Sequence, residues 1–411
     1  MTLERKSRRV VVNAAREAAP RPLLRPVRAG SASTSADAGD VSSWAAATVS
    51  TTERHVPALD GTRGIAVILV MAFHLWRSPV TALGWSGIDL FFVLSGFLIT
   101  GILWDSRLEP ERGRSFYIRR ALRILPLYYG VLIAVFIVRP ALGWAHRLDD
   151  LALANERIWY WTYLCDWRIA LNHPPAVTFL THFWTLSIEE QFYLVWPLIV
   201  WRCSRRTTLL IAGVVAVGAL LLRIGLVTAT TIPEAAYALL PCRLDALAVG
   251  AIIALGLRGP GGAAALRRWV VPTALAGVGV VAVLAVVRPS VRFIDPGMMT
   301  IGFTALDWAF AGLVLTAATV RSQLLEWSPL RAAGRYSYGL YVYHPIVMWW
   351  IVRHVPSLEQ SEWRAAVGGA IGSLFLAITS YHLYEQPFLK LKDRLAPRNG
   401  RAQLSGAVRG P

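Results

Sequence analysis

The sequence predicts an all-α protein that crosses a membrane many times as a polytopic helix bundle. Of its 411 residues, 55% are hydrophobic and only 16% are charged, whereas soluble globular domains carry about 25% charged residues. This composition excludes a mainly disordered chain and a collagen-like fibre. The three cysteines are scattered without CxxC spacing, so neither a disulfide framework nor a metal site is expected.

Apolar segments of membrane-spanning length are the second observation, because a helix needs about 20 apolar residues to cross the hydrocarbon core. Ten segments approach this length, and the first, third and ninth are the weakest because they are short or contain polar residues. They lie at 58–77, 86–105, 123–139, 182–201, 207–228, 236–257, 269–287, 299–319, 337–352 and 365–384. Residues 155–168 are aromatic but short, which indicates an interfacial or re-entrant segment.

The charge distribution is the third observation. The formal net charge of +17 suits either nucleic acid or an anionic membrane surface. The apolar content favours the lipid bilayer, and no nucleic-acid partner is expected. With ten spans, the inner segments hold more than three times as many Lys and Arg as the outer loops, which predicts that both termini face the cytoplasm. Three regions follow: a disordered basic cytoplasmic tail at 1–56, a membrane domain at 57–390 and a basic tail at 391–411.

Ionisable residues inside apolar spans are functional candidates, because their burial in hydrocarbon is unfavourable. His74 interrupts the first span, and Arg63 lies eleven residues before it. This spacing is about three helical turns, so both side chains share one face roughly 16 Å apart. Arg63 can be a simple positive-inside anchor and His74 a core histidine. Together they suit phosphate binding at the membrane edge and proton transfer further along the helix.

A second cluster, Glu189 and Glu190, interrupts the span at 182–201. Adjacent helical positions point about 100° apart, so one carboxylate is expected to face the interior. It can form a helix-to-helix hydrogen bond, orient His74 or hold an acceptor hydroxyl. Ser95, in the second span, permits close helix approach, and as a nucleophile it lacks a GxSxG frame.

Further polar candidates lie near the ends of other spans. On a helix, Arg123 lies four residues after Arg119, on the same face, and three residues after Arg120. The three form either a topology anchor or a clamp for a phosphate-bearing cosubstrate. The ninth span contains three tyrosines and His344. The tyrosines either stack on a sugar or an adenine or form an interfacial aromatic belt, and they are Tyr338, Tyr341 and Tyr343. Arg243 and Asp245 open the sixth span and can pair with other helices.

The order of these motifs resembles that of the membrane-bound acyltransferase family 3. The resemblance covers about 57–390 and rests on Leu59–Gly64, His74, Gly87–Ile99, Tyr117–Arg123, Trp184–Tyr193 and Ser337–Pro345. It implies O-acyl transfer from acyl-CoA, with acetyl-CoA as the expected donor, to a hydroxyl of a carbohydrate-containing acceptor. Such acceptors include surface polysaccharides, glycolipids and the sugars of macrolide antibiotics. It also implies a multi-pass protein of the bacterial plasma membrane.

With the family's motifs mapped onto these residues, we expect the following roles. His74 is the expected general base, oriented or assisted by Glu189 or Glu190. Acyl-CoA is expected at Arg63, Arg119, Arg120 and Arg123, and the acceptor at Ser95, Trp184, Tyr193, Tyr343 and His344. A secondary transporter or flippase of a polar or lipid-linked solute is the alternative, because buried Arg, His and Glu serve that function too. A non-catalytic membrane scaffold is a weaker alternative.

Overall fold

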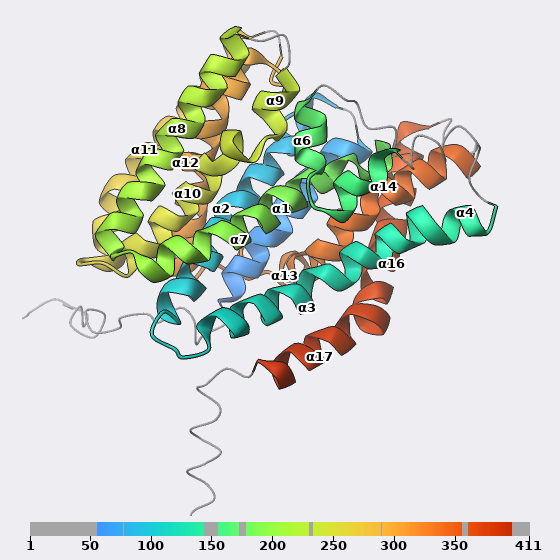
Figure 1. Cartoon of the computed structure of the whole chain (residues 1–411). Helices are drawn as coiled ribbons and strands as arrows, with labels where there is room; N and C mark the ends of the chain where they lie inside the picture. Colours follow the sequence, from blue (N-terminus) through green and yellow to red (C-terminus); the bar gives the residue numbers. More distant parts are fainter. Residues whose placement is uncertain are drawn as a thin grey trace, which may run out of the picture. The chain divides into compact units, whose positions relative to one another are not determined.

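The computed structural model describes residues 56–76, 78–143, 155–171, 178–229, 233–288, 290–355 and 361–396, and these residues are helical apart from their connecting turns (Figure 1). The predicted all-α class is confirmed. The N-terminal tail, apart from Val56, and the C-terminal residues from 397 onward lie outside the described residues. Residues 391–395, predicted as part of the basic tail, belong to the last helix.

Within the described ranges, ten long helices form the bundle. They are α1 (Pro57–Leu75), α2 (Gly87–Asp105), α3 (Arg112–Ile133), α7 (Trp184–Arg202), α8 (Arg205–Ala229), α10 (Leu240–Leu257), α11 (Gly262–Val287), α12 (Phe303–Thr319), α14 (Ser337–His354) and α16 (Glu362–Ser380). Shorter elements connect or extend them: α4 (Arg139–Ala141), α6 (Cys165–Ala170), α9 (Pro233–Ala238), α13 (Ser328–Arg335) and α17 (Gln386–Leu395), with 3-10 turns at Pro79–Thr81, Gly84–Ser86 and Thr178–Phe183 and π-helical turns at Ala134–Val138, Met298–Gly302 and Tyr381–Glu385.

Eight helices of the described chain are long and apolar enough to cross a membrane. They correspond to eight of the ten predicted segments, and the other two segments form the helices α7 and α14, whose polar residues lower their hydropathy. The third predicted span begins earlier than expected, because α3 starts at Arg112 and carries the basic run within the helix. One side of α8 exposes Leu210, Val214, Val217 and Leu221, a stripe suited to contact with lipid.

Close helix packing is centred on α2 and α10, and α1 packs against both α2 and α13. A Cβ atom on Gly96 would lie 1.9 Å from the Leu247 carbonyl oxygen, and one on Gly250 would lie 2.1 Å from that of Val93. Only glycine therefore permits this approach, as in other membrane helix pairs. Gly96, not the neighbouring Ser95, makes the close contact, so the Ser95 side chain is left free to act elsewhere.

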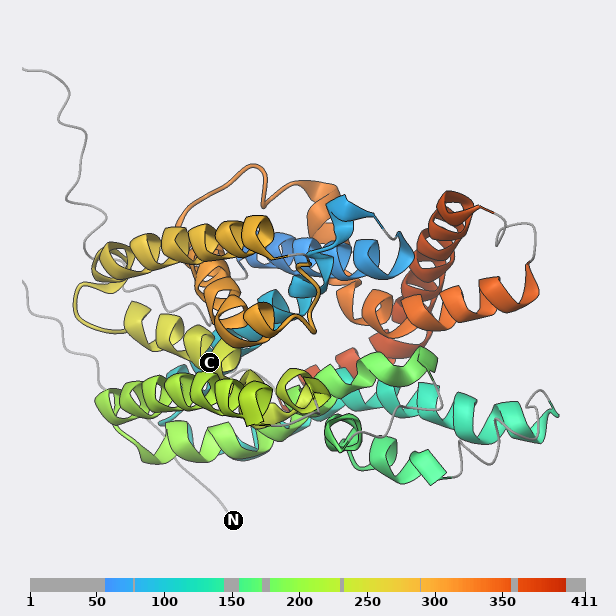
Figure 2. The same ribbon diagram turned by 90° about the horizontal axis from the view of Figure 1, so that it is seen from above.

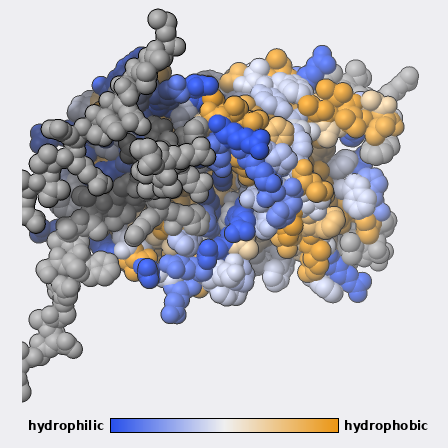
Figure 3. Space-filling model, turned by 90° about the horizontal axis from the view of Figure 1, so that it is seen from below, coloured by the Kyte–Doolittle hydropathy of each residue, from blue (hydrophilic) through white to orange (hydrophobic). Residues whose placement is uncertain are grey.

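The remaining long helices pack in pairs. Helices α8 and α10 lie side by side, as do α11 and α12 (Figure 2), and α14 packs along α16. Seen from below the view of Figure 1, hydrophilic residues lie among hydrophobic ones on the surface (Figure 3). A mixed surface of this kind suits a boundary between lipid and water better than a surface wholly within hydrocarbon.

A buried ion-pair network joins four of these helices. Arg223 of α8 forms two hydrogen bonds of 2.8 and 2.5 Å with the Asp245 carboxylate of α10, and Arg243 of α10 pairs with Asp89 of α2. All four side chains are at most 1% exposed. The predicted pairing of Arg243 and Asp245 with other helices is therefore confirmed. Asp307 of α12 is also buried and interacts with these charges.

The aromatic segment at 155–168 folds as a short helix at 155–161 followed by α6. Tyr163 joins the two with φ of 55°, a left-handed conformation that is uncommon for a residue with a Cβ atom. The Gln191 side-chain amide donates 2.9 Å hydrogen bonds to the Tyr163 carbonyl oxygen and to Asp166 Oδ1. This glutamine of α7 therefore fixes the turn.

We expect the free energy of unfolding to depend on pH because of Asp166. Burial raises the pKa of Asp166 to about 6, above its unfolded value near 3.9. Between those pH values the folded protein retains a proton that the unfolded chain releases. The free energy of unfolding should therefore fall as pH rises from about 4 to 6, by as much as about 3 kcal/mol.

The change Asp166→Asn removes this titration and leaves a side chain that can still accept a hydrogen bond from Gln191. Thermal unfolding in detergent is compared for the two proteins at pH 4.5 and pH 7.5. We expect the variant to gain stability relative to the wild type at the higher pH. An equal difference in Tm at both pH values would contradict the assignment.

Candidate active site

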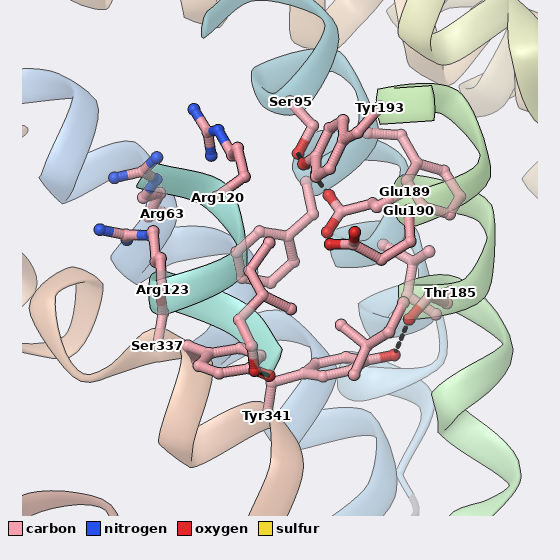
Figure 4. A pocket seen from close by; sticks show the side chains of 16 residues that line it. Arg63, Ser95, Arg120, Arg123, Thr185, Glu189, Glu190, Tyr193, Ser337 and Tyr341 are labelled. Carbon is pink, nitrogen blue, oxygen red and sulfur yellow. Dashed lines mark hydrogen bonds between the residues drawn. The ribbon is translucent and has the colours of Figure 1, made fainter. Parts of the chain in front are cut away.

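A cavity of about 100 Å³ lies between α1, α2, α3, α7 and α14. It is lined by Arg63, Ile88, Phe91, Phe92, Ser95, Arg120, Arg123, Ile124, Thr185, Leu186, Glu189, Glu190, Tyr193, Ser337, Tyr338 and Tyr341. Its polar side chains divide by charge, with three guanidinium groups toward one side and two carboxylates toward the other (Figure 4). The structure thus brings together residues from five helices that are far apart in the sequence.

The basic side of the cavity comes from two helices. Arg63 extends from the second turn of α1, with its Nη1 atom 3.7 Å from Asp60, and Arg120 and Arg123 are three residues apart on α3. Residues three apart share a helix face, which is why both arginines reach the same space. Guanidinium groups in such an arrangement bind phosphate oxygens through charge-assisted hydrogen bonds.

Arg119 does not line the cavity. Its Nη1 atom lies 3.3 Å from Asp393 Oδ1 and donates a 2.6 Å hydrogen bond to the Ala396 carbonyl oxygen. The side chain therefore holds the C-terminal end of α17 against α3 instead of joining Arg120 and Arg123. The sequence grouped the three arginines, but only two of them reach the space shared with Arg63.

The acidic side of the cavity contains both glutamates, although adjacent positions were expected to point apart. Ser95 of α2 donates a short hydrogen bond to Glu189, and the Tyr193 hydroxyl donates a 3.3 Å hydrogen bond to Ser95 Oγ. Arg120 lies over the Tyr193 ring at 5.5 Å. These contacts connect the two sides of the cavity and place a carboxylate beside a hydroxyl group.

His74 lies outside this cavity, in the last turn of α1 and one residue before the helix ends. The position is nearer a helix end than the expected interior of the bundle, and the residue is exposed. Its Nδ1 atom is 2.9 Å from the Val70 carbonyl oxygen and 3.4 Å from His344 Nε2. The expected carboxylate partner for His74 is thus replaced, among the described contacts, by a histidine of α14.

Tyr341 lies where the cavity and the histidines meet. Its side chain lines the cavity, and its hydroxyl is 2.6 Å from Thr185 Oγ1 and donates a 3.0 Å hydrogen bond to the His182 carbonyl oxygen. Its ring centroid is 5.8 Å from that of His344. Thr185 and His182 were not among the predicted site residues, whereas Tyr341 was one of the three tyrosines considered for stacking on a sugar or adenine. The tyrosine repeat at 336–343 pointed to this helix without distinguishing its faces.

Three predicted acceptor residues, Trp184, Tyr343 and His344, lie away from the cavity lining. His344 instead contacts His74. Trp184 is buried with its ring centroid 6.2 Å from that of Phe92 and 4.7 Å from that of Tyr237. The Tyr343 hydroxyl donates a 3.0 Å hydrogen bond to Ser380 Oγ, which in turn donates to Glu385. These contacts assign Trp184 to the packed core and Tyr343 to the junction of α14 with the end of α16.

The fold and the cavity define a class of protein. It is a bundle of helices, most of them long and apolar enough to span a membrane, with arginines and glutamates in one polar cavity. The chain belongs to the acyltransferase 3 family, whose acyltransferase-domain model matches residues 56–382. The resemblance seen in the order of motifs is therefore confirmed, and the chain is an acyltransferase by family.

Two curated relatives support this assignment. The peptidoglycan O-acetyltransferase OatA of Listeria monocytogenes is 29% identical over 361 residues, which cover 82% of this chain and 56% of that protein. The O-acetyltransferase OatA of Staphylococcus aureus is 30% identical over 320 residues, covering 72% and 51%. The chain thus spans about half the length of the relatives it matches. No solved structure matches the chain.

Proposed function

We propose that this protein transfers an acetyl group from acetyl-CoA to a hydroxyl of a cell-wall carbohydrate, with peptidoglycan as the favoured acceptor. The proposed binding of acetyl-CoA rests on one observation: Arg63, Arg120 and Arg123 line the same cavity. Coenzyme A presents several phosphate groups, and three guanidinium groups that face one cavity suit them through charge-assisted hydrogen bonds. The names of the two relatives, both O-acetyltransferases and one of them named for peptidoglycan, support the acetyl group and the acceptor class.

The proposed place of reaction with the acceptor follows from the positions of Arg63 and His74 near the two ends of α1. Arg63 and His74 are separated by roughly 16 Å along the helix axis, a length on the order of that of the pantetheine arm. The thioester can thus extend from the arginines toward His74. An acceptor that approaches from the far side of the bilayer would meet the exposed imidazole first.

The proposed reaction is one direct transfer. His74 Nε2 takes the proton of the acceptor hydroxyl, and the oxygen attacks the thioester carbonyl carbon. The carbon–sulfur bond breaks, and the imidazolium returns the proton to the departing thiolate. In this proposal Glu189, Glu190, Ser95 and Tyr193 hold the part of the donor between its phosphates and the thioester, since they lie opposite the arginines in the cavity.

We also propose ten transmembrane spans, with α7 and α14 added to the eight apolar helices, and both termini in the cytoplasm of a bacterial plasma membrane. Counting α7 and α14 keeps the alternation of basic inner segments with less basic outer loops. Labelling of single cysteines placed in the turns on either side of α7 tests this arrangement. Labelling of both turns from the same side would remove α7 from the count.

The change Arg123→Ala tests the donor site. We expect KM for acetyl-CoA to rise about 10- to 100-fold with kcat largely preserved, because a charge-assisted hydrogen bond to phosphate contributes about 1.5–3 kcal/mol. The matched control is Arg114→Ala on the same helix, because Arg114 forms an exposed pair with Glu111 and does not line the cavity. Transfer of labelled acetyl groups to peptidoglycan fragments in proteoliposomes gives both constants.

Three outcomes would contradict the proposal. An unchanged KM in Arg123→Ala would remove the cavity as the donor site. Uptake or flipping of a solute by the proteoliposomes without any dependence on acetyl-CoA would favour the transporter alternative. Equal effects of Arg123→Ala and Arg114→Ala would assign the loss to net charge rather than to the cavity.

A further inference from the structure

The hydrogen bonds around His74 and His344 determine which ring nitrogens carry protons. A carbonyl oxygen only accepts hydrogen bonds, so His74 Nδ1, 2.9 Å from the Val70 carbonyl oxygen, carries a proton. His344 Nδ1 is 3.1 Å from the Leu340 carbonyl oxygen and carries one for the same reason. In the neutral rings, each Nε2 therefore has a free lone pair.

The two rings meet in the complementary orientation. His344 Nε2, with its lone pair, is 3.4 Å from the protonated Nδ1 of His74, and the ring centroids are 5.0 Å apart. The Nδ1 proton of His74 is thus shared between a backbone carbonyl and the second imidazole. A contact of this length at a catalytic site commonly shortens when substrate binds.

We propose that His344 is the positioning residue for His74: it accepts the Nδ1 proton and so presents the lone pair of Nε2 to the acceptor hydroxyl. This inference rests on the proposed role of His74 as base. In a catalytic triad a carboxylate accepts the Nδ1 proton of the histidine base, and here the buried His344 has that role. The sequence analysis had expected Glu189 or Glu190 to orient His74. His344 touches neither substrate nor donor in this arrangement.

Burial and neighbours explain why a histidine suits this position. His344 is fully buried, and a neutral imidazole avoids the desolvation that an unpaired carboxylate would require in the same place. Among the described residues, the titratable groups that interact with His74 are His344 and His182. The ring centroids of His182 and His344 are 5.5 Å apart. His182 Nε2 forms a hydrogen bond with the Val342 carbonyl oxygen. Glu189 faces Ser95 instead.

The test compares His344→Phe with His344→Gln. Phenylalanine fills the space without an acceptor, so we expect kcat to fall about 10- to 100-fold with an unchanged KM for acetyl-CoA. His74 also becomes a weaker base, because nothing then accepts its Nδ1 proton beyond the backbone. The acidic limb of the kcat–pH profile should therefore shift to lower pH. Glutamine supplies a carbonyl acceptor at similar reach and should recover part of both properties.

His354→Phe is the matched control, because His354 lies on the same helix and makes the same bond to the carbonyl four residues earlier but is exposed. It should leave kcat and the pH profile unchanged. If His344→Phe does not fold, the test compares kcat of His344→Gln with kcat of His344→Asn, whose shorter side chain does not reach His74. Equal kcat values for those two would overturn the proposal.

The results separate this inference from the proposed function. Loss of activity in His74→Ala together with a wild-type rate and pH profile in His344→Phe overturns the positioning role alone. Retained activity in His74→Ala overturns the base assignment itself, and the role of His344 with it.

Discussion

The change His74→Ala should lower the rate of acetyl transfer by about 10²- to 10⁴-fold, the range typical for removal of a general base. KM for acetyl-CoA should stay near the wild-type value, because His74 does not line the cavity that contains the arginines. The measurement is transfer of labelled acetyl groups to acceptor in proteoliposomes. The split between kcat and KM distinguishes loss of the base from loss of the donor site.

Folding must be intact for this comparison. The His74 side chain is exposed and lies in the last turn of α1, so its truncation removes little packing and the variant should retain a wild-type Tm. A near-normal rate in a well-folded variant would reject the base assignment. A tenfold rise in KM for acetyl-CoA with unchanged kcat would instead assign His74 to the donor site.

The change Asp245→Ala should have the largest effect on stability. It leaves Arg223 fully buried without its carboxylate partner, and breaking a buried ion pair in this way costs about 3–5 kcal/mol. This is a large fraction of the stability of a typical domain. We expect little monodisperse protein in detergent, and any recovered fraction should have a markedly lower Tm.

Two comparisons identify the cause. Asp105→Ala breaks the pair with Arg258, whose side chains are 9% and 19% exposed, and should cost less because water can solvate the remaining charge. The double change Arg223→Met with Asp245→Leu removes both charges and should recover much of the lost stability. A wild-type Tm in Asp245→Ala would show that Arg223 is satisfied by its other acceptors, the Cys242 carbonyl oxygen and Thr304.

Much of the fold follows from the local sequence. Long apolar runs predicted the spans, since a helix is the only single segment that satisfies its own backbone in lipid. Their bounds shifted where polar residues belong to the helix, as in α3, which extends back to Arg112. Arg223, Asp89 and Asp307 were visible as charges in apolar runs, but the sequence could not pair them, because ion pairs between helices depend on how the helices pack.

The sequence by itself determined the helical class, the family and the residue types that the proposed donor and acceptor require. It also placed Arg63 and His74 on one face of one helix, since that relation depends only on helical periodicity. Tertiary structure decided which arginines share a cavity, separating Arg119 from Arg120 and Arg123 by its contact with α17. It also decided that His344, 270 residues from His74, is its neighbour. Contacts between distant segments depend on the packing of whole helices, and no local pattern in a single sequence encodes that packing.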